Sequence, residues 1–158
     1  MGTPRLFTQV IGADTFGASI RKLAEQVKDW RPFWRDVFLP RYIGQIQQNF
    51  ETEGELVGGW PDLDPTYAAW KARHFPGRKI LERTRRLRSS LAHGATGPDT
   101  VIQARPLELR FGTRVPYAKW ARIYNREPFP PIKKGEWAPI VKAYFKERAR
   151  QAGFKNVS

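Results

Sequence analysis

The sequence lacks cysteine altogether and has little histidine. Its 158 residues include no cysteine and 2 histidines, which excludes disulfides, thiolate metal sites, a cysteine nucleophile and a histidine-rich metal site. No stretch approaches the roughly 18 uncharged apolar residues that would cross a membrane, and the opening MGTPRLFTQVIG does not resemble a signal peptide. We therefore expect a protein that is made in a cytoplasm and has no membrane partner.

The motifs of common nucleotide-binding and hydrolytic sites are also missing. None of GxxxxGK[ST], GxGxxG and GxSxG occurs in the sequence. Glu51, Glu53 and Glu55 alternate in a glycine-rich stretch, but they lack the ligand spacing of a calcium loop. We predict a non-enzymatic protein with no cofactor and no bound metal. A metal-dependent enzyme that uses these three glutamates is the alternative.

Positive charge is abundant, and it is concentrated in one part of the chain. The formal net charge is +13. Residues 1–70 hold 7 Lys/Arg and 9 Asp/Glu, whereas residues 71–158 hold 21 Lys/Arg and 6 Asp/Glu. This asymmetry indicates an acidic partner, either nucleic acid or an acidic protein surface.

Hydrophobic periodicity and the positions of Pro and Gly predict a single α+β domain over residues 1–158. We expect several helices packed on a small antiparallel sheet, with the helices of 65–93 under that sheet. Asp64-Pro65 is a helix-start signature, and Pro40 predicts a kink or break near Leu39. The predicted elements are a strand in 1–12, a helical region in 14–50, a loop in 51–64, two helices in 65–93, a hairpin in 99–113, an extended proline-rich arm in 127–136 and a C-terminal helix in 137–152.

Aromatic residues are grouped in two places. Trp60, Tyr67 and Trp70 surround the Asp64-Pro65 turn, and Trp120 and Tyr124 are four residues apart. Aromatic residues beside arginines can form stacking platforms for single-stranded nucleic acid. Spacings of three and four are more typical of a buried helix face, so we predict that both groups belong to the core.

The segment ILERTRRLRSSL, residues 80–91, holds four arginines against one acidic residue, Glu82. On a continuous helix Ile80, Thr84, Leu87 and Leu91 would form one apolar stripe. We therefore predict a docked helix whose arginines surround the stripe and face DNA or an acidic partner. These arginines are Arg78, Arg83, Arg85, Arg86 and Arg88. The alternative is a small basic DNA-binding protein that acts through the arginine-rich helix 78–88.

The order of features in residues 50–91 resembles the phage virion morphogenesis family, the tail completion proteins. The family pattern has a glycine after the Thr that precedes Leu87, and Arg85 stands at that position here. The step Val115-Pro116-Tyr117-Ala118 looks like the family's Tyr-Ala step, but the His-x-Phe-Gly that usually follows is absent. The residues that carry the resemblance are Phe50, Gly54, Trp60, Leu63, Tyr67, Lys71, Gly77, Ile80, Leu81, Thr84, Leu87 and Ser90.

The resemblance implies a structural protein of the head–tail junction or of tail completion, located in the virion. Related neck proteins form closed rings, often hexamers, around the DNA channel. The implied partners are further copies of this chain, neck, portal-adaptor or tail tube proteins, and DNA in the channel. The basic half would meet the slightly acidic half of the next subunit, or it would face DNA. We expect the proline-rich arm to contact the neighbouring subunit through Pro128, Phe129, Pro130, Pro131 and Ile132.

Overall fold

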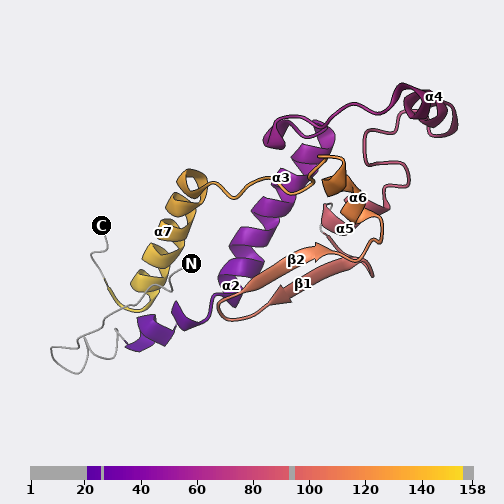
Figure 1. Ribbon diagram of the computed structural model, residues 1–158. Helices are drawn as coiled ribbons and strands as arrows, with labels where there is room; N and C mark the ends of the chain where they lie inside the picture. Colours follow the sequence, from indigo (N-terminus) through magenta and orange to yellow (C-terminus); the bar gives the residue numbers. More distant parts are fainter. Residues whose placement is uncertain (1–20, 26, 93–94, 155–158) are drawn as a thin grey trace.

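The computed structural model describes residues 21–25, 27–92 and 95–154. The predicted strand in 1–12 lies outside these described residues. Figure 1 shows the long helix α3 (Leu39–Glu51) at the centre, with helix α7 (Lys134–Gln151) on one side of it and a β-hairpin on the other. Helix α4 (Pro65–His74) stands away from them at one end of the molecule. The architecture is α+β, as the sequence predicts.

The predicted helical region contains an irregular turn just before Pro40. After helical residues 21–25 and 27–28, α2 (Arg31–Phe33) leads through the π-helical turn η1 (Trp34–Phe38) into α3 (Leu39–Glu51). Proline has no N–H to donate, and its ring crowds the carbonyl one turn earlier in a regular α-helix. The wider π turn relieves this crowding. The sequence predicts a kink or break near Leu39, whereas the structure has a π-helical turn there and the helical run continues without a break through Glu51.

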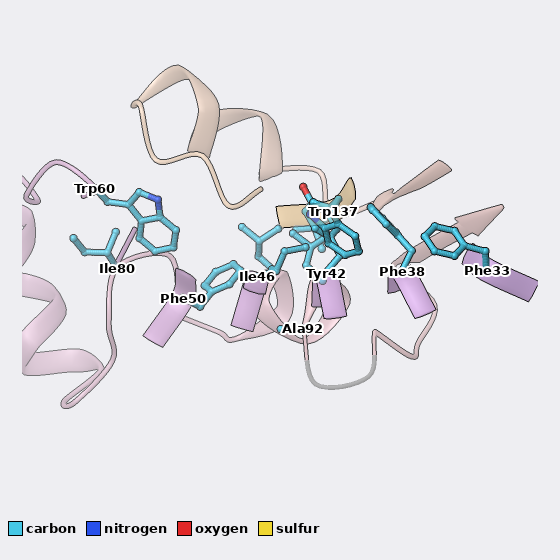
Figure 2. Close-up of a cluster of buried hydrophobic side chains, with 12 residues drawn as sticks. Phe33, Phe38, Tyr42, Ile46, Phe50, Trp60, Ile80, Ala92 and Trp137 are labelled. Carbon is cyan, nitrogen blue, oxygen red and sulfur yellow. The ribbon is translucent and has the colours of Figure 1, made fainter. Parts of the chain in front are cut away.

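The hydrophobic core follows one face of α2, η1 and α3. Phe33, Phe38, Tyr42, Ile46 and Phe50 are all buried, and their spacing of four or five residues places them in one row along the helical axis (Figure 2).

Helix α7 (Lys134–Gln151) covers one end of this row. The ring of Trp137 lies 4.5 Å from that of Phe38, and Tyr144 lies 5.1 Å from Phe33, measured between ring centroids. The helix begins at Lys134, three residues earlier than the sequence indicates, and Pro139 lies inside it.

The predicted hairpin is confirmed, with strands β1 (Thr100–Ala104) and β2 (Leu109–Thr113). The strands are antiparallel, and Thr100 pairs with Thr113. An isolated two-stranded hairpin is only marginally stable, so its packing matters. The hydroxyl of Ser90 lies 2.7 Å from that of Thr113, and Thr100 donates to the Ser90 carbonyl at 3.0 Å.

Helix α4 (Pro65–His74) begins as predicted, but it does not lie under the sheet. The Asp64 carboxylate caps it by accepting from the Tyr67 backbone N–H at 3.1 Å. Lys71 is the one buried residue of this helix. Tyr67 and Trp70 are each 40% exposed, so the prediction that they belong to the core is wrong. The helix has no wide apolar face that would hold it against the body of the protein.

The prediction of a helix through residues 78–93 is wrong over its first part. Helix α5 spans only Arg86–Leu91, and the preceding residues form turns in which Leu81 and Arg85 have positive φ angles of 61° and 58°. Leu87 and Leu91 are buried as predicted, whereas Thr84 is exposed. The helical periodicity therefore holds only from Arg86 onward.

The proline-rich segment is not a free arm. Pro128 and Pro130 are buried, whereas Pro131 and Ile132 are exposed and Phe129 is half-buried. Prolines donate no N–H, so this segment offers mainly carbonyl acceptors. Side chains from elsewhere in the chain donate to these carbonyls. Three buried side chains from the helical region and the following loop supply these donors. The bonds are Tyr42 Oη to the Pro130 carbonyl at 2.9 Å, Asn49 Nδ2 to the Glu127 and Pro128 carbonyls at 3.2 Å each, and Trp60 Nε1 to the Glu127 carbonyl at 3.0 Å.

These contacts give a first prediction. Asn49→Ala is expected to lower the free energy of unfolding by about 1–3 kcal/mol, because it leaves a buried carbonyl without a donor. Asn49 is 0% exposed. Urea unfolding followed by tryptophan fluorescence measures the change. Gln48→Ala, at an exposed position of the same helix, is the control and is expected to change stability by less than about 0.5 kcal/mol. Equal effects of the two substitutions would show that the proline-rich segment is not held by Asn49.

Candidate functional site

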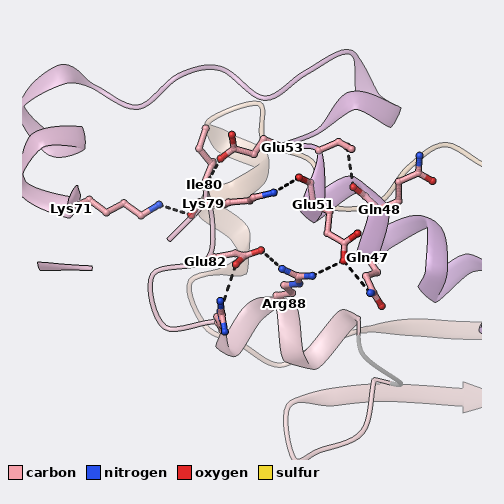
Figure 3. Close-up of polar contacts among 11 residues, drawn as sticks. Gln47, Gln48, Glu51, Glu53, Lys71, Lys79, Ile80, Glu82 and Arg88 are labelled. Atoms are coloured by element: carbon pink, nitrogen blue, oxygen red, sulfur yellow. Dashed lines mark hydrogen bonds and ion pairs between the residues drawn. The ribbon is translucent and has the colours of Figure 1, made fainter. Parts of the chain in front are cut away.

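Arg88 lies inside the protein rather than on a surface that could face DNA. Its guanidinium donates to the Glu82 carboxylate at 2.5 Å and to the Glu51 carboxylate at 2.9 Å (Figure 3). The side chains of Arg88 and Glu82 are 12% and 3% exposed. Sequence reasoning missed this pair because a helical wheel places Glu82 on the polar side. Arg88 therefore supports the fold and does not present its charge to a partner.

The other four arginines do not share one environment. Arg86 makes two hydrogen bonds to Asp99, at 2.6 and 2.8 Å, and this pairing lowers the pKa of the Asp99 carboxyl. Arg85 lies 3.7 Å from Glu82. Arg83 lies over the Phe75 ring at 5.9 Å.

Arg78 is half-buried, and its buried Nη1 has no partner among the described residues. Of the five arginines, only Arg78 and Arg83 form no ion pair with a carboxylate in the described part of the chain.

The three glutamates of the alternative metal site do not converge on one point. Glu51 binds Arg88, Glu53 accepts from the Ile80 N–H at 2.8 Å, and Glu55 is exposed. Within the described residues no group of three or more His, Asp or Glu side chains is placed to hold a metal ion. Nearby, Lys71 donates to the Lys79 carbonyl (Figure 3). Burial lowers the pKa of Lys71.

A groove of about 530 Å³ lies between the start of α4, the turns after Ile80 and the region of α6 (Ala118–Ile123). Its apolar part is formed by Leu63, Ile80 and Leu81. We call it the aromatic groove because three tyrosines also line it. These are Tyr67, Tyr117 and Tyr124, which are 40%, 40% and 58% exposed.

Exposed aromatic rings continue beyond the aromatic groove. The rings of Tyr67 and Trp70 stack at 5.6 Å, and Trp70 stacks on His74 at 4.7 Å. Trp120 is 47% exposed, and its ring centroid lies 6.4 Å from that of Tyr124. The prediction that Trp120 and Tyr124 are buried together is therefore wrong. Short helices with few packing neighbours leave these rings in solvent.

Basic side chains line the same groove. Arg83 and Arg126 belong to it, with Lys71 at its buried end. Arg126 donates to the carbonyls of Pro61 and Asp62, at 3.0 and 2.7 Å. Sequence reasoning singled out Arg83 but not Arg126. No local signal in the sequence marks Arg126, because the carbonyls that it binds belong to residues 65 and 64 positions earlier in the chain.

The chain matches no protein-family model, no curated protein and no solved structure. In the part of the chain that the structure describes, no helix combines the length and the apolar character needed to cross a membrane.

Proposed function

We propose that the protein is a non-enzymatic structural protein of the phage head–tail junction or of tail completion. It assembles as a ring around the DNA channel, in the virion, after synthesis in the host cytoplasm. Its partners are further copies of the chain, in a ring such as a hexamer, and neck, portal-adaptor or tail tube proteins. The support comes from the structural roles of the residues that carry the family resemblance.

The backbone conformation of Arg85 is the observation that carries the proposal. The family pattern has glycine at this position, and Arg85 has φ 58°, in the left-handed region that favours glycine. The glycines of the pattern, Gly54 and Gly77, also have positive φ angles, of 95° and 69°. Within residues 50–91 the chain therefore adopts positive φ at each of the three positions where the family pattern has glycine, although one of them is Arg85 here.

Other residues of the pattern maintain the packing of this region. The rings of Phe50 and Trp60 meet edge to face at 5.4 Å, and the backbone of Gly54 lies against Trp60. Ile80, Leu87 and Ser90 are buried. These residues therefore act through packing and backbone geometry, which suits a protein that functions by its shape.

The exposed aromatic residues supply contact surface for assembly. Tyrosine, tryptophan and arginine are enriched at the energetic centres of protein interfaces, and these residue types surround the aromatic groove. In the proline-rich segment, Pro131 and Ile132 remain free to contact a neighbouring subunit, and Ile132 is 58% exposed. Pro128 and Pro130 are buried, and their carbonyls accept hydrogen bonds from Asn49 and Tyr42.

The proposed function is tested by deleting the gene that encodes this chain from its phage genome. The expected products, seen by electron microscopy of the lysate, are heads and tails that are not joined or tails that are not completed. A plasmid copy of the gene restores joined particles. Normal infectious particles from the deletion strain would overturn the proposal.

The conformation of Arg85 gives a second prediction. Arg85→Gly is expected to raise the free energy of unfolding by about 1 kcal/mol, since glycine adopts positive φ without steric cost. The Arg85–Glu82 contact that it removes is long and its arginine is 58% exposed, so little is lost. Thermal and urea unfolding measure the change. Arg86→Gly, at a helical position paired with Asp99, is expected to destabilise. Destabilisation by both would show that residue 85 does not favour glycine.

A further inference from the structure

We propose that the aromatic groove binds an acidic peptide segment of a partner protein that inserts one aliphatic or aromatic side chain. This inference rests on the proposed assembly function and names the chemistry of the partner. The groove is lined by the apolar side chains of Leu63, Ile80 and Leu81 and by three tyrosines.

The apolar part of the aromatic groove calls for an apolar anchor. Ile80 is 8% exposed and Leu81 is half-buried. Both residues line the groove, so they contribute apolar surface to it. Tyr67 and Tyr124 also line the groove, with 40% and 58% of their area exposed. An inserted leucine or phenylalanine would remove this apolar surface from water, which is the main source of binding energy at interface centres.

The charge of the aromatic groove calls for carboxylates. Neither Arg83 nor Arg126 takes part in an ion pair among the described residues; Arg83 lies over Phe75, and Arg126 lies over Tyr124 at 5.8 Å and donates to two carbonyls. Asp64 is the one carboxylate among the described residues that line the groove, and it accepts from a backbone N–H as a helix cap. The local charge is therefore positive, and Asp or Glu beside the anchor would compensate it.

Contacts within the chain hold the turns after Ile80, which line one part of the aromatic groove. Leu81 adopts φ 61°, a conformation that costs a non-glycine residue of the order of 1 kcal/mol or more. The Glu53 carboxylate holds the preceding Ile80 N–H at 2.8 Å, and Tyr117 contacts the Thr84 hydroxyl at 3.1 Å. A pre-formed groove loses less entropy when a segment binds.

The same residues favour a peptide over single-stranded nucleic acid. A base that entered the apolar part would leave its polar edge without hydrogen-bond partners beside Leu63, Ile80 and Leu81. Tyr67 already has one face stacked on Trp70, which limits the platform for successive bases. An aliphatic or phenyl side chain has no such polar edge.

Selection from a displayed library of random 12-residue peptides on the immobilised full-length chain tests the inference. We expect enriched sequences in which an aliphatic or aromatic residue is flanked by Asp or Glu. A synthetic peptide of the enriched sequence is then titrated by fluorescence anisotropy at about 150 mM salt. Arg83→Glu is expected to weaken its binding at least tenfold, and Tyr67→Ala to weaken it severalfold.

Arg73→Glu is the matched control. Arg73 is exposed on the same helix as Tyr67, has no acidic partner among the described residues and does not line the aromatic groove. It makes the same charge change near the groove, so an unchanged affinity would exclude a general electrostatic effect. Circular dichroism melting shows whether each variant is folded.

Three results would overturn the inference. The first is a selection that enriches no peptide or peptides without acidic residues. The second is peptide binding that Arg83→Glu and Arg73→Glu weaken equally. The third is a fluorescein-labelled 12-residue oligothymidylate that binds more tightly than the peptide and loses affinity in Arg83→Glu and Tyr67→Ala, which would assign the groove to nucleic acid. Since the gene-deletion phenotype does not depend on these variants, failure here is distinguishable from failure of the proposed function.

Discussion

Arg88→Met is expected to lower the free energy of unfolding by about 3–5 kcal/mol, since it leaves a buried carboxylate without its partner. Glu82 is 2% exposed and lies 2.5 Å from the Arg88 guanidinium. Arg85, at 3.7 Å, is too far away to replace that contact. Methionine is of similar length and keeps most of the packing of the side-chain stem. Urea unfolding of the two proteins at pH 7 gives the difference.

The double variant Glu82→Gln, Arg88→Met separates the buried charge from packing. Removal of both charges is expected to recover a large part of the lost stability, because no uncompensated carboxylate remains. Glu82→Gln alone is expected to cost less than Arg88→Met, since Arg88 keeps the Glu51 carboxylate at 2.9 Å. A double variant as unstable as Arg88→Met would assign the effect to packing instead.

Gly54→Ala is expected to destabilise by roughly 2–5 kcal/mol, from backbone strain and steric overlap together. Gly54 has φ 95°, and a Cβ there would lie 2.3 Å from Trp60 Cδ1 and 2.7 Å from the Trp60 backbone nitrogen. The backbone atom cannot move without disturbing the bond from the Trp60 N–H to the Glu53 carbonyl, which is 2.8 Å long. The variant is measured by thermal and urea unfolding.

Gly58→Ala is the control for backbone strain alone. Gly58 has φ 92°, but no atom of the described residues lies within 4 Å of an added Cβ. Its cost is expected to be about 1–2 kcal/mol, the strain of a left-handed alanine. The additional loss of unfolding free energy in Gly54→Ala over Gly58→Ala then measures the steric overlap with Trp60. Equal costs at the two positions would show that Trp60 moves away freely, contrary to its place in the core.

Local signals in the sequence predict local features of this fold well. Asp64-Pro65 marks the start of α4, and alternation around Arg105-Pro106 marks the hairpin. The burial of Leu87 and Leu91 also follows from helical spacing. In each case the determining atoms lie within a few residues of one another.

Features that depend on distant residues are not predictable in this way. The helix expected at 78–93 gives way to turns, because Glu82 is drawn inward by Arg88 and Leu81 adopts a left-handed conformation. The proline-rich segment 127–136 is held by side chains such as Asn49, which is 78 or more residues away along the chain. Such contacts leave no periodic trace in the sequence.

The candidate site was predictable only in composition. The sequence shows aromatic residues and arginines, but a three- or four-residue spacing cannot tell a buried ring from an exposed one. Tyr67 and Trp70 are exposed because α4 stands away from the body of the protein (Figure 1). The tertiary structure alone brings Arg126 to the side of Arg83 in one groove.

Multi-angle light scattering over a concentration series tests the central claim, assembly into a ring, most directly. One chain has a mass of 18.3 kDa. We predict a mass that rises with concentration and levels at a fixed integer multiple of this value, as a closed ring requires. A mass of 18.3 kDa at every concentration, together with tight binding of duplex DNA at about 150 mM salt, would contradict the account and favour a monomeric DNA-binding protein.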